Sequence, residues 1–117
     1  MTAEKFGSVS SVTVVSAGPC GCAFAADLAS RGKSVLLYGH PEHPGAIPMI
    51  GNNDGWLNAS GEINGRYQIK TTSDLNIVIR HSKFIVITVP SYGQDTILGA
   101  LSGFDLQNHT IVVNAED

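Results

Sequence analysis

A chain of 117 residues, of which 43% are hydrophobic, can bury one core and is therefore expected to form a single domain. Its net charge of −3 argues against a surface that binds nucleic acid. No apolar run reaches the length of a membrane-spanning helix, and the first residues lack the pattern of a signal peptide. The two cysteines, Cys20 and Cys22, predict reduced thiols in a cytoplasmic protein rather than a disulfide or a metal site.

The first third of the chain has the pattern of a strand, a turn, a helix and a second strand. Val12–Val15 is an apolar, β-branched run that predicts a parallel strand buried on both faces. Cys20–Arg31 carries small and apolar residues at helical spacing, and Gly32 suits the left-handed end of that helix. Val35–Tyr38 predicts a second buried strand. This order is that of the opening βαβ unit of a dinucleotide-binding fold.

The turn before the helix, SAGPCG, follows the pattern G-x-G-x-x-G with Ser16 in the first slot. A helix N-terminus has unpaired N–H groups and a partial positive charge, which together bind an anion. Gly18 is expected to let the backbone approach a pyrophosphate, and Gly21 to let the helix lie close to the strand. Pro19 suits the first turn of the helix. Ser16 fits this turn only if its φ is negative.

The middle of the chain is expected to form a loop and a β-hairpin. Gly39–Asp54 contains three prolines, which predict a loop with at most a short helical turn. Trp56–Ser60 and Arg66–Lys70 predict two strands joined through Gly61–Gly65, where the Asn-Gly pair is typical of a tight turn. Trp56 is expected to pack within this hairpin rather than against a ligand.

A second helix and a third buried strand follow. Ser73–His81 predicts a short helix with Thr72 or Ser73 as its N-cap. Phe84–Val89, with the sequence FIVITV, predicts a buried parallel strand that Pro90 ends.

The last predicted elements are the helix Ser91–Ser102 and the strand Thr110–Asn114. The residues expected on the apolar face of this helix are Ile97, Leu98 and Leu101. Alternating strands and helices predict an α/β fold, a Rossmann-type open parallel sheet that is truncated and carries a β-hairpin insert.

Residues 1–9 are expected to form a flexible tail, and residues 10–117 one dinucleotide-binding domain. In an open parallel sheet the ligand lies beyond the carboxyl ends of the strands. The segments expected to converge there are Ser16–Gly21, Tyr38–His40 and Val89–Tyr92. Because the second half of a doubly wound sheet is missing, an exposed sheet edge is expected to favour self-association.

Two segments, VTVVSAGPCGCAFAADLASRGKSVLLY and FIVITVPSYGQDTILGAL, resemble the N-terminal NAD(P)-binding domain of the opine dehydrogenases, the octopine and nopaline synthase group. The run T-V-P-x-x-G-Q-x-x-I-L at Thr88–Leu98 is the most specific part of the resemblance. The resemblance implies a reductive condensation, in which an amino acid and a 2-oxo acid form an imine that is reduced with NAD(P)H. It covers the cofactor domain only, so the C-terminal catalytic domain is expected to be absent and the chain alone to be inactive.

The resemblance also implies which residues bind the cofactor. It assigns Gly18, Pro19, Cys20 and Gly21 to the pyrophosphate, Gly39 and His40 to the adenosine ribose, and Val89 and Pro90 to the inner part of the dinucleotide. Gly39 stands where an NAD-binding unit has Asp or Glu, so a 2′-phosphate is tolerated and His40 can donate a hydrogen bond to it. We therefore expect NADP(H), or the use of both NADP and NAD. The resemblance provides no catalytic residue; Tyr92 and Gln94 either line the nicotinamide side or only begin a helix.

Two other interpretations remain open. The domain could belong to an enzyme with a similar N-terminal fold, such as a glycerol-3-phosphate dehydrogenase or a ketopantoate reductase. It could also be a non-catalytic polypeptide that binds a nucleotide weakly or associates with a partner. The amino acid and 2-oxo acid substrates do not follow from the sequence.

Overall fold

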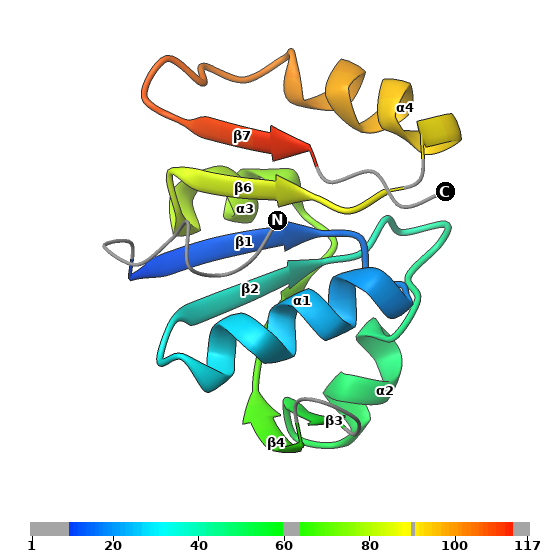
Figure 1. The fold of residues 1–117 in the computed structure, drawn as a ribbon. Helices are drawn as coiled ribbons and strands as arrows, with labels where there is room; N and C mark the ends of the chain where they lie inside the picture. The colour runs from blue at the N-terminus through cyan, green and yellow to red at the C-terminus, as the bar shows by residue number, and fades with distance from the viewer. Residues whose placement is uncertain (1–9, 60–63, 90, 114–117) are drawn as a thin grey trace.

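Apolar strands alternate with helices to form a five-stranded parallel sheet, which confirms the predicted Rossmann-type fold (Figure 1). The structure is a computed structural model that describes residues 10–59, 64–89 and 91–113. The expected N-terminal tail and Pro90 lie outside these ranges. From one edge to the other, the strands are β5 (Lys70–Thr72), β2 (Ser34–Tyr38), β1 (Ser11–Val15), β6 (Phe84–Ile87) and β7 (Thr110–Val113). The strand order reverses between β1 and β6, which is where such sheets bind ligands.

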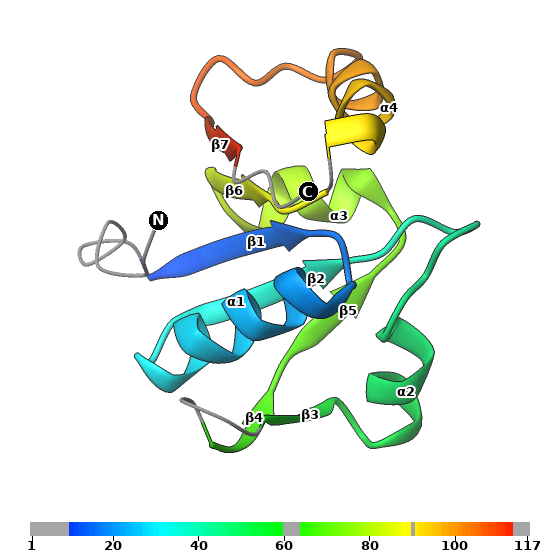
Figure 2. The same ribbon diagram turned by 45° about the vertical axis from the view of Figure 1, so that its right-hand side comes forward.

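Helices cover both faces of the sheet (Figure 2). The helices are α1 (Pro19–Ser30), α2 (Ile47–Asn52), α3 (Leu75–His81) and α4 (Ser91–Leu101). On β1, Val12 and Val14 pack in the core cluster that includes α1, whereas Val15 packs in the cluster of α3 and α4. Because both faces of the central strands β1, β2 and β6 are buried, their sequences are mostly apolar rather than alternating. Among the helices of the described residues, none is both long and apolar enough to cross a membrane.

The hairpin consists of β3 (Trp56–Ala59) and β4 (Gly65–Gln68), which pair antiparallel. The guanidinium carbon of Arg66 lies 4.6 Å from the centroid of the Trp56 ring, so Trp56 packs within the hairpin as expected. The Asn-Gly pair is not a two-residue turn, because Ala59 already pairs with Gly65 and residues 60–64 connect the strands.

One strand of the main sheet was not predicted. Arg66–Lys70 was expected to be a single hairpin strand, but the chain divides at Ile69, which is 2% exposed and belongs to the core. The Ile69 amide donates to the Gly55 carbonyl at 2.8 Å. Beyond Ile69 the chain pairs with β2 as β5 and becomes an edge strand of the parallel sheet.

Three smaller expectations are corrected by the structure: the N-cap of α3, the burial of Leu98 and the end of β6. The N-cap of α3 is Asp74 rather than Thr72 or Ser73, since its carboxylate accepts from the Asn76 amide at 2.9 Å. Thr72 instead accepts a hydrogen bond from the Asp74 amide at 3.0 Å. On α4, Leu98 is 39% exposed, whereas Ile97 and Leu101 are buried. The strand β6 ends at Ile87, two residues before the predicted end.

Among the described strands, β7 lies at one edge of the sheet and pairs with β6 alone. Its last residue, Val113, is 44% exposed. Self-association through an exposed edge stays a prediction.

Two buried threonines provide a test of the core. Thr13 is fully buried, and its hydroxyl has no hydrogen-bond partner among the described residues. Thr88 is also buried, but its hydroxyl donates to the Val15 carbonyl at 3.0 Å. We expect Thr13→Val to raise the free energy of unfolding by about 1 kcal/mol, because it removes an unpaired buried hydroxyl. Thr88→Val is the matched control and should lower it by about 1 kcal/mol. Urea unfolding measures both; destabilisation by Thr13→Val would contradict the assignment.

Candidate functional site

The turn after β1 has a strained backbone at Ser16. Its φ is +112°, although a negative φ was expected, so this expectation is wrong. The Ser16 amide still donates to the Tyr38 carbonyl at 3.0 Å, which continues the pairing of β1 with β2 and fixes the direction of the chain. The Ser16 hydroxyl accepts from the Gly18 amide at 3.4 Å. A non-glycine residue in this region costs about 1–3 kcal/mol.

The start of α1 packs closely against this turn at Gly21. A Cβ on Gly21 would overlap the carbonyl oxygen of Ser16 and would lie 3.0 Å from the hydroxyl of Thr88. Only glycine therefore lets α1 approach the ends of β1 and β6 to this extent. The close packing expected at this glycine is observed.

The N-terminus of α1 is open to an anion. Gly18 is the N-cap, Pro19 is in the first turn, and no side chain caps the helix. The first turn carries no acidic residue. A Cβ added at Gly18 would have as its nearest neighbour the Ser16 hydroxyl, at 3.7 Å. The residues present therefore fit a pyrophosphate, which needs backbone access and a positive helix end.

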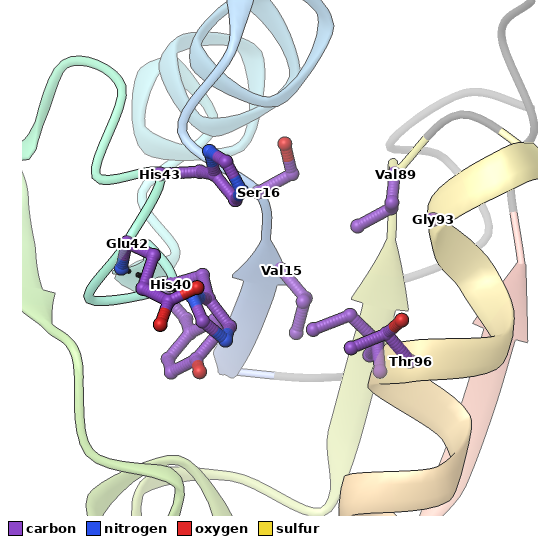
Figure 3. A pocket seen from close by; sticks show the side chains of 10 residues that line it. Val15, Ser16, His40, Glu42, His43, Val89, Gly93 and Thr96 are labelled. Carbon is purple, nitrogen blue, oxygen red and sulfur yellow. Dashed lines mark hydrogen bonds between the residues drawn. The ribbon is translucent and has the colours of Figure 1, made fainter.

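A pocket of about 400 Å³ lies beside this turn, at the carboxyl ends of the strands (Figure 3). Its volume is within the range of about 300–1,000 Å³ that is typical of ligand sites. Ser16, His40, Glu42 and His43 line one side, and Val89, Gly93 and Thr96 line the other, with Val15 between them. The remaining lining residues are Tyr38 and Ile97.

The pocket brings together some of the predicted site residues. His40 and Val89 line it, whereas Gly18, Pro19, Cys20 and Gly21 form the adjoining helix start and Gly39 lies directly after β2. Pro90 lies outside the described residues. Gln94 donates its amide to the Val89 carbonyl at 3.2 Å, so it supports the backbone of the pocket wall.

Several residues that line the pocket were not predicted from the sequence, including Glu42 and Thr96. Thr96 follows Gly93 by three residues, so helical spacing could have placed both on one face of α4. Glu42 gave no such signal, because its position depends on a turn after β2.

That turn runs from His40 to His43. The His43 amide donates to the His40 carbonyl at 2.9 Å, and the Glu42 amide donates to Nδ1 of His40 at 3.0 Å. Because Nδ1 accepts this hydrogen bond, Nε2 is the ring nitrogen of His40 that remains to face the pocket as a possible partner of a ligand. The two imidazole centroids are 5.9 Å apart, and the described part of the chain holds no group of His, Cys, Asp and Glu suited to a metal ion.

Among the described residues, Cys20 and Cys22 form no disulfide. Burial raises the pKa of the Cys22 thiol, whose sulfur lies 3.5 Å from the Ala17 carbonyl as a hydrogen-bond donor. A raised pKa disfavours the thiolate, so Cys22 has a packing role.

The two other histidines lie away from the pocket, near the amino ends of the strands. His109 contacts the Ile79 carbonyl at 3.0 Å, and His81 contacts the Ser34 carbonyl at 3.4 Å. Burial lowers the pKa of His81; the Ser34 carbonyl opposes this shift and the charge of Lys70 adds to it. Both side chains are half-buried and contact backbone carbonyls near the ends of elements.

The family described as the NAD-dependent glycerol-3-phosphate dehydrogenase N-terminus matches residues 11–116 of the chain. The chain belongs to this family. It is therefore an NAD-binding domain of the kind found in NAD(P)-dependent dehydrogenases.

The chain is similar to enzymes of two kinds, D-nopaline dehydrogenases and glycerol-3-phosphate dehydrogenases. D-nopaline dehydrogenases of Agrobacterium vitis and of Agrobacterium tumefaciens (strain T37) are each 35% identical, over 80% and 87% of this chain. A glycerol-3-phosphate dehydrogenase [NAD(P)+] of Photorhabdus laumondii is 34% identical over 73% of the chain. The matches cover 23%, 25% and 24% of these relatives, so the chain spans about a quarter of their length. The resemblance to opine dehydrogenases is confirmed at the level of this domain.

The close contact at Gly21 predicts that adding a methyl group there strongly lowers the stability of the fold. Gly21→Ala should lower the free energy of unfolding by about 3 kcal/mol, because α1 must move away from Ser16. The matched control is Gly99→Ala on the exposed face of α4, where no heavy atom lies within 4 Å of the new Cβ. It should raise the free energy of unfolding by about 0.5–1 kcal/mol. Chemical unfolding of both variants measures the difference, and equal stabilities would refute the close packing.

Proposed function

We propose that the chain is the dinucleotide-binding part of an opine dehydrogenase. Such an enzyme condenses the amino group of an amino acid with a 2-oxo acid, releases water, and reduces the resulting imine to a secondary amine with NAD(P)H. The observation that carries the dinucleotide-binding role is the pocket at the strand-order reversal between β1 and β6, next to the open N-terminus of α1. The 35% identity to two D-nopaline dehydrogenases supports this choice of reaction.

In this proposal the described residues bind and orient the dinucleotide. The backbone at Gly18 and the first turn of α1 bind the pyrophosphate, and the segment Gly39–His40 lies at the adenosine ribose. Val89 contributes an apolar wall on the opposite side of the pocket. The bound dinucleotide supplies the reducing equivalents. We assign the groups that bind the amino acid and the 2-oxo acid to a further domain.

A glycerol-3-phosphate dehydrogenase is the second candidate. The family match and the 34% identity of the Photorhabdus laumondii relative favour it. Both candidates require the same dinucleotide site and differ only in the substrate, so the pocket geometry is compatible with either.

The nucleotide site can be tested without disturbing the fold. Gly18 has an extended backbone (φ −78°, ψ −173°) that valine also adopts, and no protein atom would clash with a Cβ there. Gly18→Val should therefore remain folded, with a cost of about 1 kcal/mol at the N-cap. Its side chain should block the pyrophosphate and weaken NADH binding at least about tenfold, or roughly 1.4 kcal/mol. Isothermal titration calorimetry measures the affinity.

The control for this experiment is Gly51→Ala, which adds a side chain to α2 where nothing lies within 4 Å. It should bind NADH as the unmodified chain does. A folded Gly18→Val variant with unchanged affinity would contradict a pyrophosphate at this helix end.

The chain alone is expected to form no opine from any amino acid and 2-oxo acid, since it spans about a quarter of its relatives. A chimera in which it replaces the matching region of the Agrobacterium tumefaciens D-nopaline dehydrogenase should restore opine formation. The equivalent chimera with the Photorhabdus laumondii glycerol-3-phosphate dehydrogenase should be the less active of the two, because its domain contacts differ. Activity of only the second chimera would favour the second candidate, and turnover by the isolated chain would refute its inactivity.

A further inference from the structure

Position 39, where an NAD-binding unit has its ribose-binding carboxylate, has no room for a side chain. A Cβ on Gly39 would lie 2.6 Å from Cγ1 of Ile47 and 2.8 Å from the Pro44 carbonyl oxygen. Real Cβ atoms do not approach heavy atoms this closely. The missing carboxylate at the end of β2 is therefore a consequence of how the following loop packs.

The same loop places a different carboxylate in the pocket. The loop is held against the phosphate-binding turn by the Ala46 amide, which donates to the Ala17 carbonyl at 3.0 Å. The His40–His43 turn then brings Glu42 to the pocket wall beside His40 (Figure 3). Glu42 is three residues beyond position 39 and faces the same space at the end of β2.

A second cavity of about 380 Å³ adjoins the pocket and shares Tyr38, His40, Thr96 and Ile97 with it. This cavity adds Asp74, the N-cap of α3. Burial raises the pKa of the Tyr38 phenol, and the charge of Asp74 raises it further. The Asp74 carboxylate therefore interacts electrostatically with a side chain that lines both cavities.

The carboxylates around the two cavities are not matched by a lysine or an arginine among the lining residues that the structure describes. Among the described residues that line them, Glu42 and Asp74 are carboxylates, and no Lys or Arg is present. Nδ1 of His40 is occupied as the acceptor of the Glu42 amide, and His43 is the other imidazole. A 2′-phosphate carries a charge of about −2 at neutral pH and would meet repulsion without a cation to offset it. A ribose 2′-hydroxyl would instead find an acceptor.

We propose that Glu42 is the specificity-determining residue of the dinucleotide site and that it favours NAD(H) over NADP(H). The inference rests on the proposed function, because it assumes that the adenosine ribose lies in this pocket. Gly39 and His40 alone led us to expect NADP(H) or the use of both cofactors; Glu42, from the following loop, favours NAD(H) instead. Asp74 adds to the same preference from the neighbouring strand end.

Calorimetric titration of the purified chain with NADH and with NADPH tests the proposal. The unmodified chain should bind NADH about tenfold more tightly than NADPH. Glu42→Gln removes the charge of an exposed side chain and keeps its length, so the variant should fold. It should bind NADPH about tenfold more tightly than the unmodified chain does, while its affinity for NADH is unchanged or lower.

Asp105→Asn is the matched control. Asp105 lies in the loop before β7 and outside both cavities, and its side chain accepts from the Gln107 amide at 3.1 Å, which asparagine can also do. This variant has the same net charge as Glu42→Gln and should keep both affinities. Circular dichroism checks that each variant is folded.

The outcomes separate the two proposals. Binding of neither dinucleotide to a folded chain overturns the proposed function, and the role of Glu42 with it. Tighter binding of NADPH than of NADH by the unmodified chain overturns the role of Glu42 and leaves the proposed function intact. So does a Glu42→Gln variant whose affinities for NADH and NADPH change by the same factor. An equal gain in NADPH affinity from Asp105→Asn would show a general charge effect and would also overturn it.

Discussion

The contact between Gly21 and the carbonyl of Ser16 fixes the geometry of the whole site. Three elements meet there, since the hydroxyl of Thr88 on the chain after β6 also faces Gly21. The first turn of α1 is thereby held at the ends of β1 and β6, where the strand order reverses. The strained φ of Ser16 is part of the same arrangement, because the chain must leave β1 sharply to begin a helix that packs so closely. The open helix end and the pocket beside it follow from this junction.

A second contact joins the two halves of the site. The Ala46 amide binds the Ala17 carbonyl, and Gly45, with a φ of +55°, approaches the same residue so closely that a side chain there would overlap it. The loop after β2 is consequently packed on the turn Ser16–Gly21, and the two segments form one packed unit. This packing also excludes a side chain at Gly39, so the acidic group of the site comes from within the loop.

The sequence was sufficient for the features that depend on periodicity and on local backbone rules. Continuous apolar runs identified the strands β1, β2 and β6, and Gly32, with a φ of +82°, ends α1 as expected. The features it did not reveal depend on contacts between segments distant in the chain. Ile69 divides a predicted hairpin strand because it enters the core, and the φ of Ser16 is imposed by a helix and a neighbouring strand. The place of Glu42 in the pocket was not predicted because it depends on the side chain of His40 within a short turn and on the contact of the following Ala46 with the distant Ala17.

The strand order has a consequence for how the chain folds. The central strand β1 has neighbours on both sides, and its register pairs Val12 with Val35 but Thr13 with Ile85. The pairing of β1 with β2 needs only the chain through α1 and β2, whereas the pairing of β1 with β6 forms only after most of the chain is available. Pairings of such large sequence separation slow folding. During synthesis on the ribosome, the β6 side of β1 stays unpaired until Ile87 has emerged, and an apolar strand edge of this kind is prone to aggregate. The nascent chain is thus most vulnerable between the completion of β2 and the arrival of β6, a period in which chaperone binding would protect it.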